Sequence, residues 1–217
     1  PEPEPEPPPP PVEAEPTPTV QPEPPPTGSA RPGRVKVPAF GAQLLLGSGT
    51  LKRGKNGLAQ TEDELDVKSA VGFAATWDTQ LFLEGLRIGA RLGLDRGTVD
   101  ELGADGDVTS LQIGARARYV RPFGNKWHYY GALALGPSNV SIDFENLDGS
   151  GAGFHFALEG GVAYAFWGVP FVLGLHVIND SVPELDVTWK NVGNISPSKK
   201  IEDSTFTRGG LTLGAWF

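Results

Sequence analysis

Apolar and polar side chains alternate with a period of two residues through most of the chain after residue 35, and this pattern constrains the fold more than any other feature. In Val108–Tyr119, one set of alternate positions is mostly apolar, and the other holds serine, glutamine, glycine and arginine. A β-strand turns successive side chains to opposite faces, so such a segment forms a strand with two unlike faces. No apolar run approaches the roughly 18–20 residues that a transmembrane helix needs. The chain is therefore predicted to be all-β.

Eight segments show this alternation and are predicted to be strands. They are Ala39–Leu46, Val67–Trp77, Leu81–Leu94, Val108–Tyr119, Trp127–Gly136 with Val140–Phe144 as its continuation, Phe154–Phe166, Phe171–Val177 and Thr205–Phe217. Their connections are alternately long and short, at about 20, 3, 13, 6, 9, 4 and 26 residues. This rhythm, with both chain ends on the short-turn side, is typical of an eight-stranded antiparallel up-and-down transmembrane β-barrel.

Alternation alone does not decide which face of the sheet points inward. A water-soluble barrel of lipocalin type packs its apolar residues inside, whereas a transmembrane barrel turns them toward lipid. The second face here is rich in glycine and arginine and would make a poor dry core, while the other face is almost free of charge. Aromatic residues also collect beside the short turns, as they do at a membrane interface. We therefore expect the apolar rows to face lipid.

The final predicted strand ends on the aromatic residue Phe217, and the run YYGALALG occupies Tyr129–Gly136. Together with the strand–loop rhythm, these features make residues 35–217 resemble the small eight-stranded outer-membrane β-barrels of the OmpA transmembrane domain and OmpX type. The resemblance implies an outer-membrane location in a diderm bacterium, with periplasmic termini, extracellular long loops and lipid or lipopolysaccharide as surroundings. It also implies a terminal assembly signal that includes Leu213, Ala215 and Phe217.

If the glycine- and arginine-rich face points inward, a set of charged residues lies inside the barrel. The predicted set is Lys68, Arg87, Arg91, Arg116, Arg118, Glu159 and Arg208. Eight strands enclose a lumen that side chains roughly fill, so we expect a salt-bridged polar plug in which arginines satisfy Glu159. The excess of bases over acids also leaves open a narrow, anion-preferring path through the barrel.

The sequence contains little that indicates catalysis or metal binding. A lipid A-modifying barrel enzyme would need a His-x-Ser pattern, but none of His128, His155 and His176 has a serine two positions later. The absence of cysteine excludes disulfides and thiolate metal sites. The acidic stretch Asp95–Asp107 lacks the carboxylate spacing of an EF-hand and is interpreted as a solvated loop. We predict no catalytic, cofactor or metal site, and the charge balance does not favour nucleic-acid binding.

Residues 1–34 differ from the rest of the chain. They contain 15 of the 21 prolines, with six glutamates against two arginines. A segment with so few apolar residues does not fold alone, so it is predicted to be a disordered or polyproline arm. The arm is either a passive tether or a docking arm for a periplasmic or envelope-spanning protein, since preformed polyproline costs little entropy to bind. The docking interpretation assigns the contact to prolines along the arm, namely Pro1, Pro7, Pro11, Pro16, Pro24 and Pro26.

The function predicted from these features is that of a non-enzymatic membrane anchor or accessory subunit, whose arm of residues 1–34 docks on a partner. A small passive channel with an arginine-lined lumen and a lipid A-modifying enzyme are the alternatives. The oligomeric state, the identity of the partner and any ligand of the outer loops do not follow from the sequence.

Overall fold

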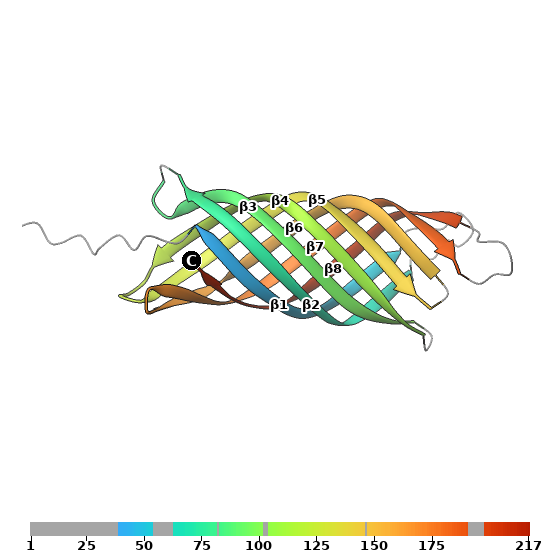
Figure 1. Ribbon diagram of the computed structural model, residues 1–217, viewed down its shortest axis with the longest axis horizontal. Coiled ribbons are helices and arrows are strands. Elements are labelled where there is room, and N and C mark those ends of the chain that lie inside the picture. The colour runs from blue at the N-terminus through green and yellow to red at the C-terminus, as the bar shows by residue number, and fades with distance from the viewer. Residues whose placement is uncertain (1–38, 54–62, 82, 102–103, 146, 191–197) are drawn as a thin grey trace, which may run out of the picture. The chain divides into compact units, whose positions relative to one another are not determined.

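The alternating segments fold into one sheet. The computed structural model describes residues 39–53, 63–81, 83–101, 104–145, 147–190 and 198–217. Eight strands occupy these residues (Figure 1): β1 Phe40–Arg53, β2 Asp63–Gln80, β3 Leu86–Glu101, β4 Ala104–Pro122, β5 Trp127–Phe144, β6 Leu147–Phe166, β7 Val169–Trp189 and β8 Ser198–Trp216. Among the described residues, no helix has the length and apolarity needed to cross a membrane.

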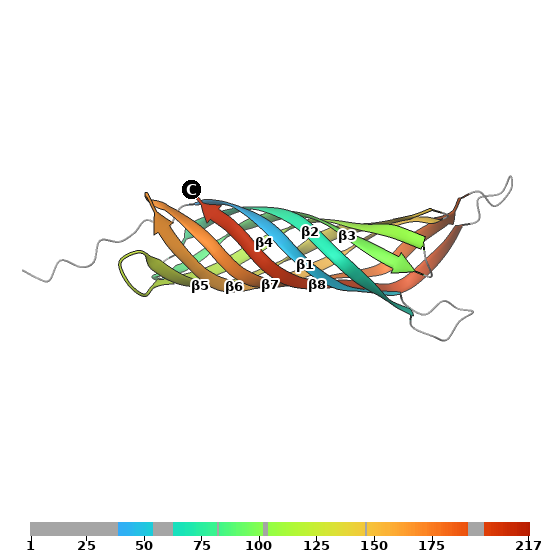
Figure 2. The same cartoon turned by 90° about the horizontal axis from the view of Figure 1, so that it is seen from below.

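The sheet closes on itself as an antiparallel barrel in which each strand pairs with its neighbours in sequence (Figures 1 and 2). β1 closes the ring by pairing with β8, from Gly41 opposite Trp216 to Lys52 opposite Thr205. Because the ring is closed, none of the eight described strands is an edge strand, which is the condition for a sheet to stand in hydrocarbon. The predicted fold class, an eight-stranded antiparallel up-and-down barrel, is confirmed.

The two ends of the barrel differ. The short connections β2–β3, β4–β5 and β6–β7 lie at the end where β1 starts and β8 finishes, and we call this the turn end; the opposite end is the loop end. The predicted tight turn at Asp78–Gln80 is wrong, because β2 continues through Gln80 and the chain turns only afterwards. Gly85 lies in that turn with a φ of 83°, a left-handed conformation that favours glycine.

The apolar rows in the turn-end half of the barrel face outward. Leu111, Ile113 and Leu213 are 51%, 58% and 41% exposed, whereas Arg87 and Arg116 are 7% and 2% exposed. Charged side chains therefore point to the barrel axis and aliphatic side chains point away from it. This confirms the predicted orientation of the two faces and excludes the lipocalin-type arrangement for this half.

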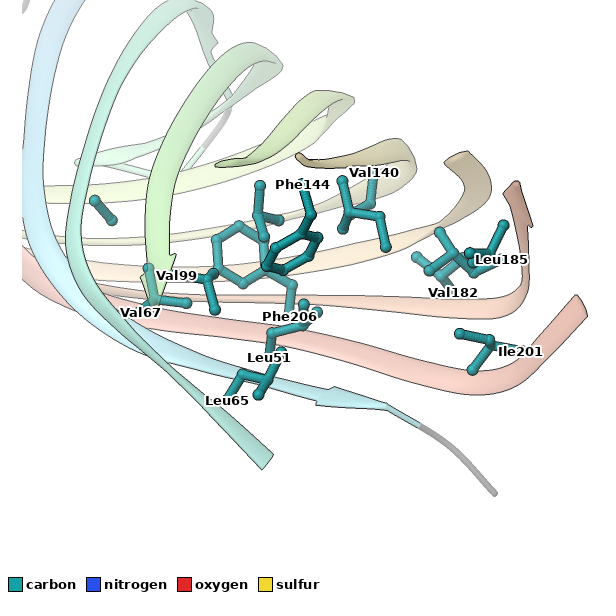
Figure 3. Close-up of a cluster of buried hydrophobic side chains, with 14 residues drawn as sticks. Leu51, Leu65, Val67, Val99, Val140, Phe144, Val182, Leu185, Ile201 and Phe206 are labelled. Atoms are coloured by element: carbon teal, nitrogen blue, oxygen red, sulfur yellow. The ribbon is translucent and has the colours of Figure 1, made fainter. Parts of the chain in front are cut away.

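The loop-end half of the barrel has the opposite arrangement. Its interior is filled by apolar side chains, which we call the loop-end core (Figure 3): Leu51, Leu65, Val67, Ala70, Val99, Val108, Val140, Ile142, Phe144, Val182, Leu185, Val187, Ile201 and Phe206. Many of these positions were predicted to be loops, in Gly47–Asp66, Asp95–Asp107 and Asn179–Ser204. Those predictions are wrong in large part, because the strands continue into these ranges. The alternation persists there, but the apolar residues occupy the inward positions.

The outer surface of the loop-end half carries charged side chains that pair with charges on other strands. Lys52 lies 3.3 Å from Glu64, and Lys190 lies 2.7 Å from Asp143 and 2.6 Å from Asp148. The hydrogen bond from the Lys190 ammonium holds the pKa of the Asp143 carboxyl below its usual range. Exposed charged pairs of this kind require water around them, because moving charged groups into hydrocarbon is costly.

The change of polarity along the barrel marks where hydrocarbon ends. The outward apolar row runs from Leu111 to Tyr119 on β4 and from Phe171 to Val177 on β7. The row on β4 reaches the roughly 9–11 residues with which a tilted strand crosses the apolar part of a bilayer, and the row on β7 is shorter by about two residues. The turn-end half is therefore the transmembrane part, and the loop-end half stands in water with a dry interior. Residues 1–34 lie outside the described residues, so the proline-rich arm stays a prediction.

The inverted polarity of the loop-end half generates a test with adjacent residues. Ile142 is 2% exposed in the loop-end core, while Ser141 faces outward on the same strand. We expect Ile142→Asn to destabilise the barrel by about 3 kcal/mol or more, because it loses apolar burial and leaves an amide in an apolar site. Ser141→Asn should change stability by less than about 0.5 kcal/mol. Urea unfolding in lipid vesicles, followed by tryptophan fluorescence, measures both; equal effects would contradict a dry loop-end interior.

Candidate functional site: the charged layer of the barrel interior

A layer of charged side chains crosses the inside of the transmembrane half. The arginines occupy every second or fourth position on their strands, which keeps them on the inward face. β3 supplies Arg87 and Arg91, β4 supplies Arg116 and Arg118, and β8 supplies Arg208. The buried acids among the described residues are Asp78 on β2, Asp95 on β3, Glu159 on β6 and Asp180 on β7. All nine side chains are at most 7% exposed.

Asp78 holds the part of this layer nearest the turn end. Its Oδ2 accepts hydrogen bonds from Arg116 Nη1 at 3.0 Å and from Arg118 Nη2 at 2.7 Å. Arg87 donates to the Asp78 backbone oxygen at 3.2 Å. The Arg118 guanidinium also stacks on the Trp216 ring, 4.2 Å from its centroid. Asp78 therefore contacts three arginines, two through its carboxylate and one through its backbone oxygen.

Trp216 belongs to an apolar cluster at the turn end, which we call the turn-end plug: Val120, Tyr130, Ala163, Val172 and Trp216. The Tyr130 and Trp216 rings meet edge to face with centroids 5.3 Å apart. These side chains are at most 4% exposed. The charged layer therefore lies between two apolar layers, the turn-end plug on one side and the loop-end core on the other.

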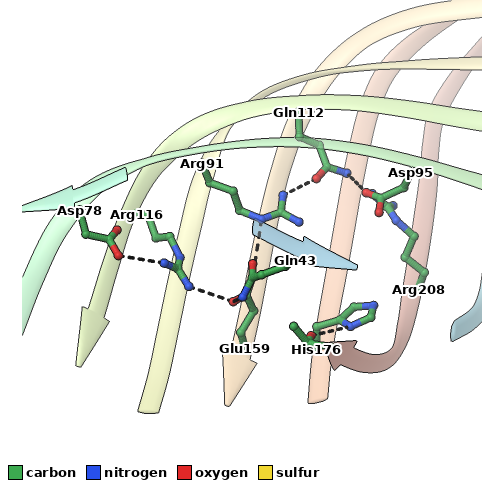
Figure 4. A network of polar contacts seen from close by, with 10 residues as sticks. Gln43, Asp78, Arg91, Asp95, Gln112, Arg116, Glu159, His176 and Arg208 are labelled. Atoms are coloured by element: carbon green, nitrogen blue, oxygen red, sulfur yellow. Dashed lines mark hydrogen bonds and ion pairs between the residues drawn. The ribbon is translucent and has the colours of Figure 1, made fainter. Parts of the chain in front are cut away.

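Glu159 lies at the centre of the charged layer (Figure 4). Its Oε2 accepts from Arg116 Nη2 at 3.0 Å and from Gln43 Nε2 at 3.1 Å, while its Oε1 lies 3.5 Å from Arg91 Nε. Arg116 thus bridges Glu159 and Asp78. These contacts join β1, β3, β4 and β6, which are not all neighbours in the sheet.

The loop-side part of the layer continues from Arg91 through Gln112. Arg91 Nη1 donates to Gln112 Oε1 at 2.6 Å, and Gln112 Nε2 donates to Asp95 at 2.8 Å and to Asp180 at 3.2 Å. Arg208 forms ion pairs of 2.6 Å with both Asp95 and Asp180. Hydrogen bonds and ion pairs thus connect the side chains of the layer without a break from Arg118 to Arg208.

β5 contributes small side chains at this level. Ala132 lies opposite Arg118 and Ala134 lies opposite Arg116 in the β4–β5 ladder. Both alanines are buried. An eight-stranded lumen has little spare room, so long side chains on one strand need small ones on its neighbour. The small residues of β5 leave the space that the two arginines of β4 fill.

The structure brings together six of the seven charged residues predicted for the lumen. Lys68 is the one it places elsewhere: its side chain is exposed on the outer surface. The pairing of β2 with both neighbours shifts by one residue here, between Val67 and Ser69 on the β3 side. Lys68 is the extra residue of a β-bulge, and a bulge moves later residues to the other face. The prediction assumed strict alternation and was wrong for this reason.

Three of the four buried acids were not among the residues predicted for the lumen. Asp78 was assigned to a turn, Asp95 to an acidic loop and Asp180 to the longest loop. Each continues the inward alternation of its strand, Asp95 following Arg87 and Arg91 at intervals of four, so the signal was present. With these acids included, the described interior holds five arginines against four carboxylates. The predicted excess of bases, which motivated an anion-preferring path, shrinks to one charge.

The three histidines point inward but lie apart from one another. His155 Nδ1 is 3.2 Å from the Pro137 backbone oxygen, and His176 Nδ1 is 3.1 Å from the Thr212 hydroxyl. His155 and Glu159 share the inward face of β6, four residues and roughly 13 Å apart along the strand. The described residues contain no group of three or more histidine, aspartate or glutamate side chains arranged to hold a metal ion.

Comparison with known proteins gives similarities of fold. The chain is similar to Neisserial surface protein A, with 16% identity over 80% of this chain and 96% of that one and a TM-score of 0.44. It is similar to OprG from Pseudomonas aeruginosa, with 12% identity over 84% and 99% and a TM-score of 0.44. It is also similar to the outer membrane protein AlkL, with 15% identity over 88% and 95% and a TM-score of 0.45. No protein-family model and no curated protein matches the chain.

The burial of the charged layer predicts a large effect of removing one acid. Glu159→Gln removes the negative charge that pairs with Arg91 and Arg116 inside the barrel. Breaking a buried ion pair lowers the free energy of unfolding by about 3–5 kcal/mol. The matched control is Glu184→Gln, which removes the exposed partner of Lys200 and should cost less than about 1 kcal/mol. Urea unfolding in vesicles compares the two variants. If Glu159→Gln lowers the free energy of unfolding no more than the control does, water reaches the charged layer and the prediction is wrong.

Proposed function

We propose that the chain is a non-enzymatic, non-conducting anchor in the bacterial outer membrane, which presents residues 1–34 to a periplasmic or envelope-spanning protein. The observation that carries this proposal is the closed interior: a paired charged layer lies between two apolar layers. The lumen of such a barrel is filled by side chains. Its interactions are then made by its two ends, its outer wall and the segments attached to them.

The interior opposes the channel alternative at three levels. Ions crossing the barrel would have to pass the turn-end plug, displace the arginine–carboxylate bonds and then cross the loop-end core. The charged layer carries an excess of only one positive charge among the described residues, so it offers anions little selective attraction. Each of the two apolar layers also excludes ions, because transferring a charge into such a site is very costly.

The histidines give no support to the enzyme alternative. Hydrolysis of a lipid by a serine mechanism needs a histidine within hydrogen-bond reach of a serine and oriented by an acid. His155 and His176 instead contact a backbone oxygen and a threonine hydroxyl. Both are buried within the barrel, where a lipid substrate does not reach them.

The position of β1 supports a periplasmic arm. β1 begins at the turn end, where Phe40 and Phe217 exchange backbone hydrogen bonds of 3.1 and 2.7 Å. In outer-membrane barrels the short turns face the periplasm. Residues 1–34 therefore precede a strand that starts at the periplasmic end. Their proline and glutamate composition suits binding in an extended form on an aromatic, basic groove of the partner.

A non-conducting barrel predicts the outcome of planar-bilayer recordings. The purified full chain should give no steady conductance, in the same bilayers where a general porin gives large steps. Arg116→Ala should remain closed, because the turn-end plug and the loop-end core are both intact. A wild-type conductance that falls on Arg116→Ala or Arg87→Ala would favour the channel instead.

The docking role predicts a partner that depends on the arm. Crosslinking in intact envelopes should capture one periplasmic or envelope-spanning protein with the full chain, and deletion of residues 1–34 should abolish the capture. A matched variant replaces Pro1, Pro7, Pro11, Pro16, Pro24 and Pro26 by alanine and keeps every glutamate. It should lose most of the capture if the polyproline conformation is recognised. Unchanged partners in the deletion variant would contradict the anchor proposal while leaving the closed barrel unaffected.

A further inference from the structure

The backbone ladder between β4 and β5 is interrupted at one place, although the two strands stay in close contact there. The register runs unchanged from Gln112 opposite Ser138 to Ala115 opposite Leu135, but the two residue pairs between these positions are missing. Pro137 lies in this gap and has no backbone N–H to donate to the ladder. β5 stays paired with β6 through the same stretch. The interruption is therefore confined to one side of β5.

A pocket of about 270 Å³ opens on the outer face at this interruption. It is lined by Leu92, Leu111, Ile113, Pro137, Ser138 and Asn139. The three aliphatic side chains are 50%, 51% and 58% exposed and belong to the lipid-facing rows. Elsewhere the barrel wall is convex, so a lipid acyl chain contacts it along one side only. In this hollow, apolar side chains from three strands can contact an acyl chain on several sides.

The pocket lies where the apolar rows end. Leu111 is paired with Asn139, and the next outward residues toward the loop end are the polar Thr109 and Ser141. Asn139 is exposed, and its carboxamide makes no hydrogen bond with the described part of the protein. The pocket thus has an apolar floor in the hydrocarbon zone and one free amide at the zone of lipid carbonyls.

We propose that this pocket binds the ester-linked acyl chain of a membrane lipid from the leaflet at the loop end. The first methylenes of the chain lie against Leu92, Leu111 and Ile113, and the Asn139 amide donates to the ester carbonyl. An amide is a suitable partner because it offers two N–H donors to a carbonyl oxygen. The site is on the outer wall and does not depend on the anchor role of residues 1–34.

Native mass spectrometry of the full chain tests the proposal, with nanodiscs of palmitoyl-oleoyl-phosphatidylethanolamine as the lipid source. The wild type should retain one lipid at detergent concentrations that remove the surrounding ones. Ile113→Trp fills the pocket and should lower the retained fraction at least tenfold. The matched control is Leu173→Trp, at a 52% exposed lipid-facing position on β7, which should retain lipid like the wild type. Circular dichroism and heat-dependent gel mobility verify that each variant is a folded barrel.

The polar contact has its own test. Asn139→Leu keeps the apolar pocket and removes the donor, so lipid affinity should fall about fivefold, the equivalent of one net hydrogen bond. Ser181→Leu, an exposed position on β7 near the same boundary, is the control and should have no effect. Three results would overturn the proposal: no retained lipid in the wild type, equal losses in the two tryptophan variants, or unchanged affinity in Asn139→Leu.

Discussion

The boundary between hydrocarbon and water outside the barrel determines what fills its inside. In the transmembrane half, aliphatic side chains face lipid, so the inward positions are left for polar residues, which must then satisfy one another. In the loop-end half, water surrounds the wall, and the same alternation places charges outside and Val99, Ile142 and Phe206 inside. One continuous sheet therefore serves two solvents by exchanging the roles of its faces. Every other feature of the interior follows from this exchange.

The charged layer contributes more to the uniqueness of the barrel than to its gross stability. Removing ions from water is costly, and buried ion pairs seldom exceed that cost by much. Their geometry is nevertheless restrictive. Backbone ladders connect only neighbouring strands, whereas the pairs Arg116–Glu159, Gln43–Glu159 and Arg208–Asp95 connect strands that are two or three positions apart in the ring. A slip of one residue in any of these strands would turn a buried charge toward lipid. The layer therefore selects the register in which all its charges are paired.

Sequence reasoning found the strand number, the order and the orientation of the faces in the transmembrane half, because two-residue alternation states these directly. The predictions were wrong in the loop-end half, where the apolar residues of the alternation face inward. Beyond the hydrocarbon boundary, charged residues such as Arg96 and Asp107 face outward and pair with each other. Sequence of this kind looks like a loop when an apolar outer face is expected. The same expectation hid Asp78, Asp95 and Asp180 from the predicted lumen. Lys68 was wrongly placed in the lumen for a different reason: no local sequence signal marks the β-bulge that turns its side chain outward.

Under the proposed function, the barrel acts through its surfaces. The loop-end half extends the rigid wall beyond the membrane and carries paired charges such as Lys190 with Asp143. The turn end holds the start of β1, where the chain arrives from residues 1–34. Between them, the lipid-facing wall has a hollow beside Pro137, where two residue pairs of the β4–β5 ladder are missing. Pro137 has no N–H to donate to the ladder, and the pocket beside it is the place where we propose that a lipid chain binds.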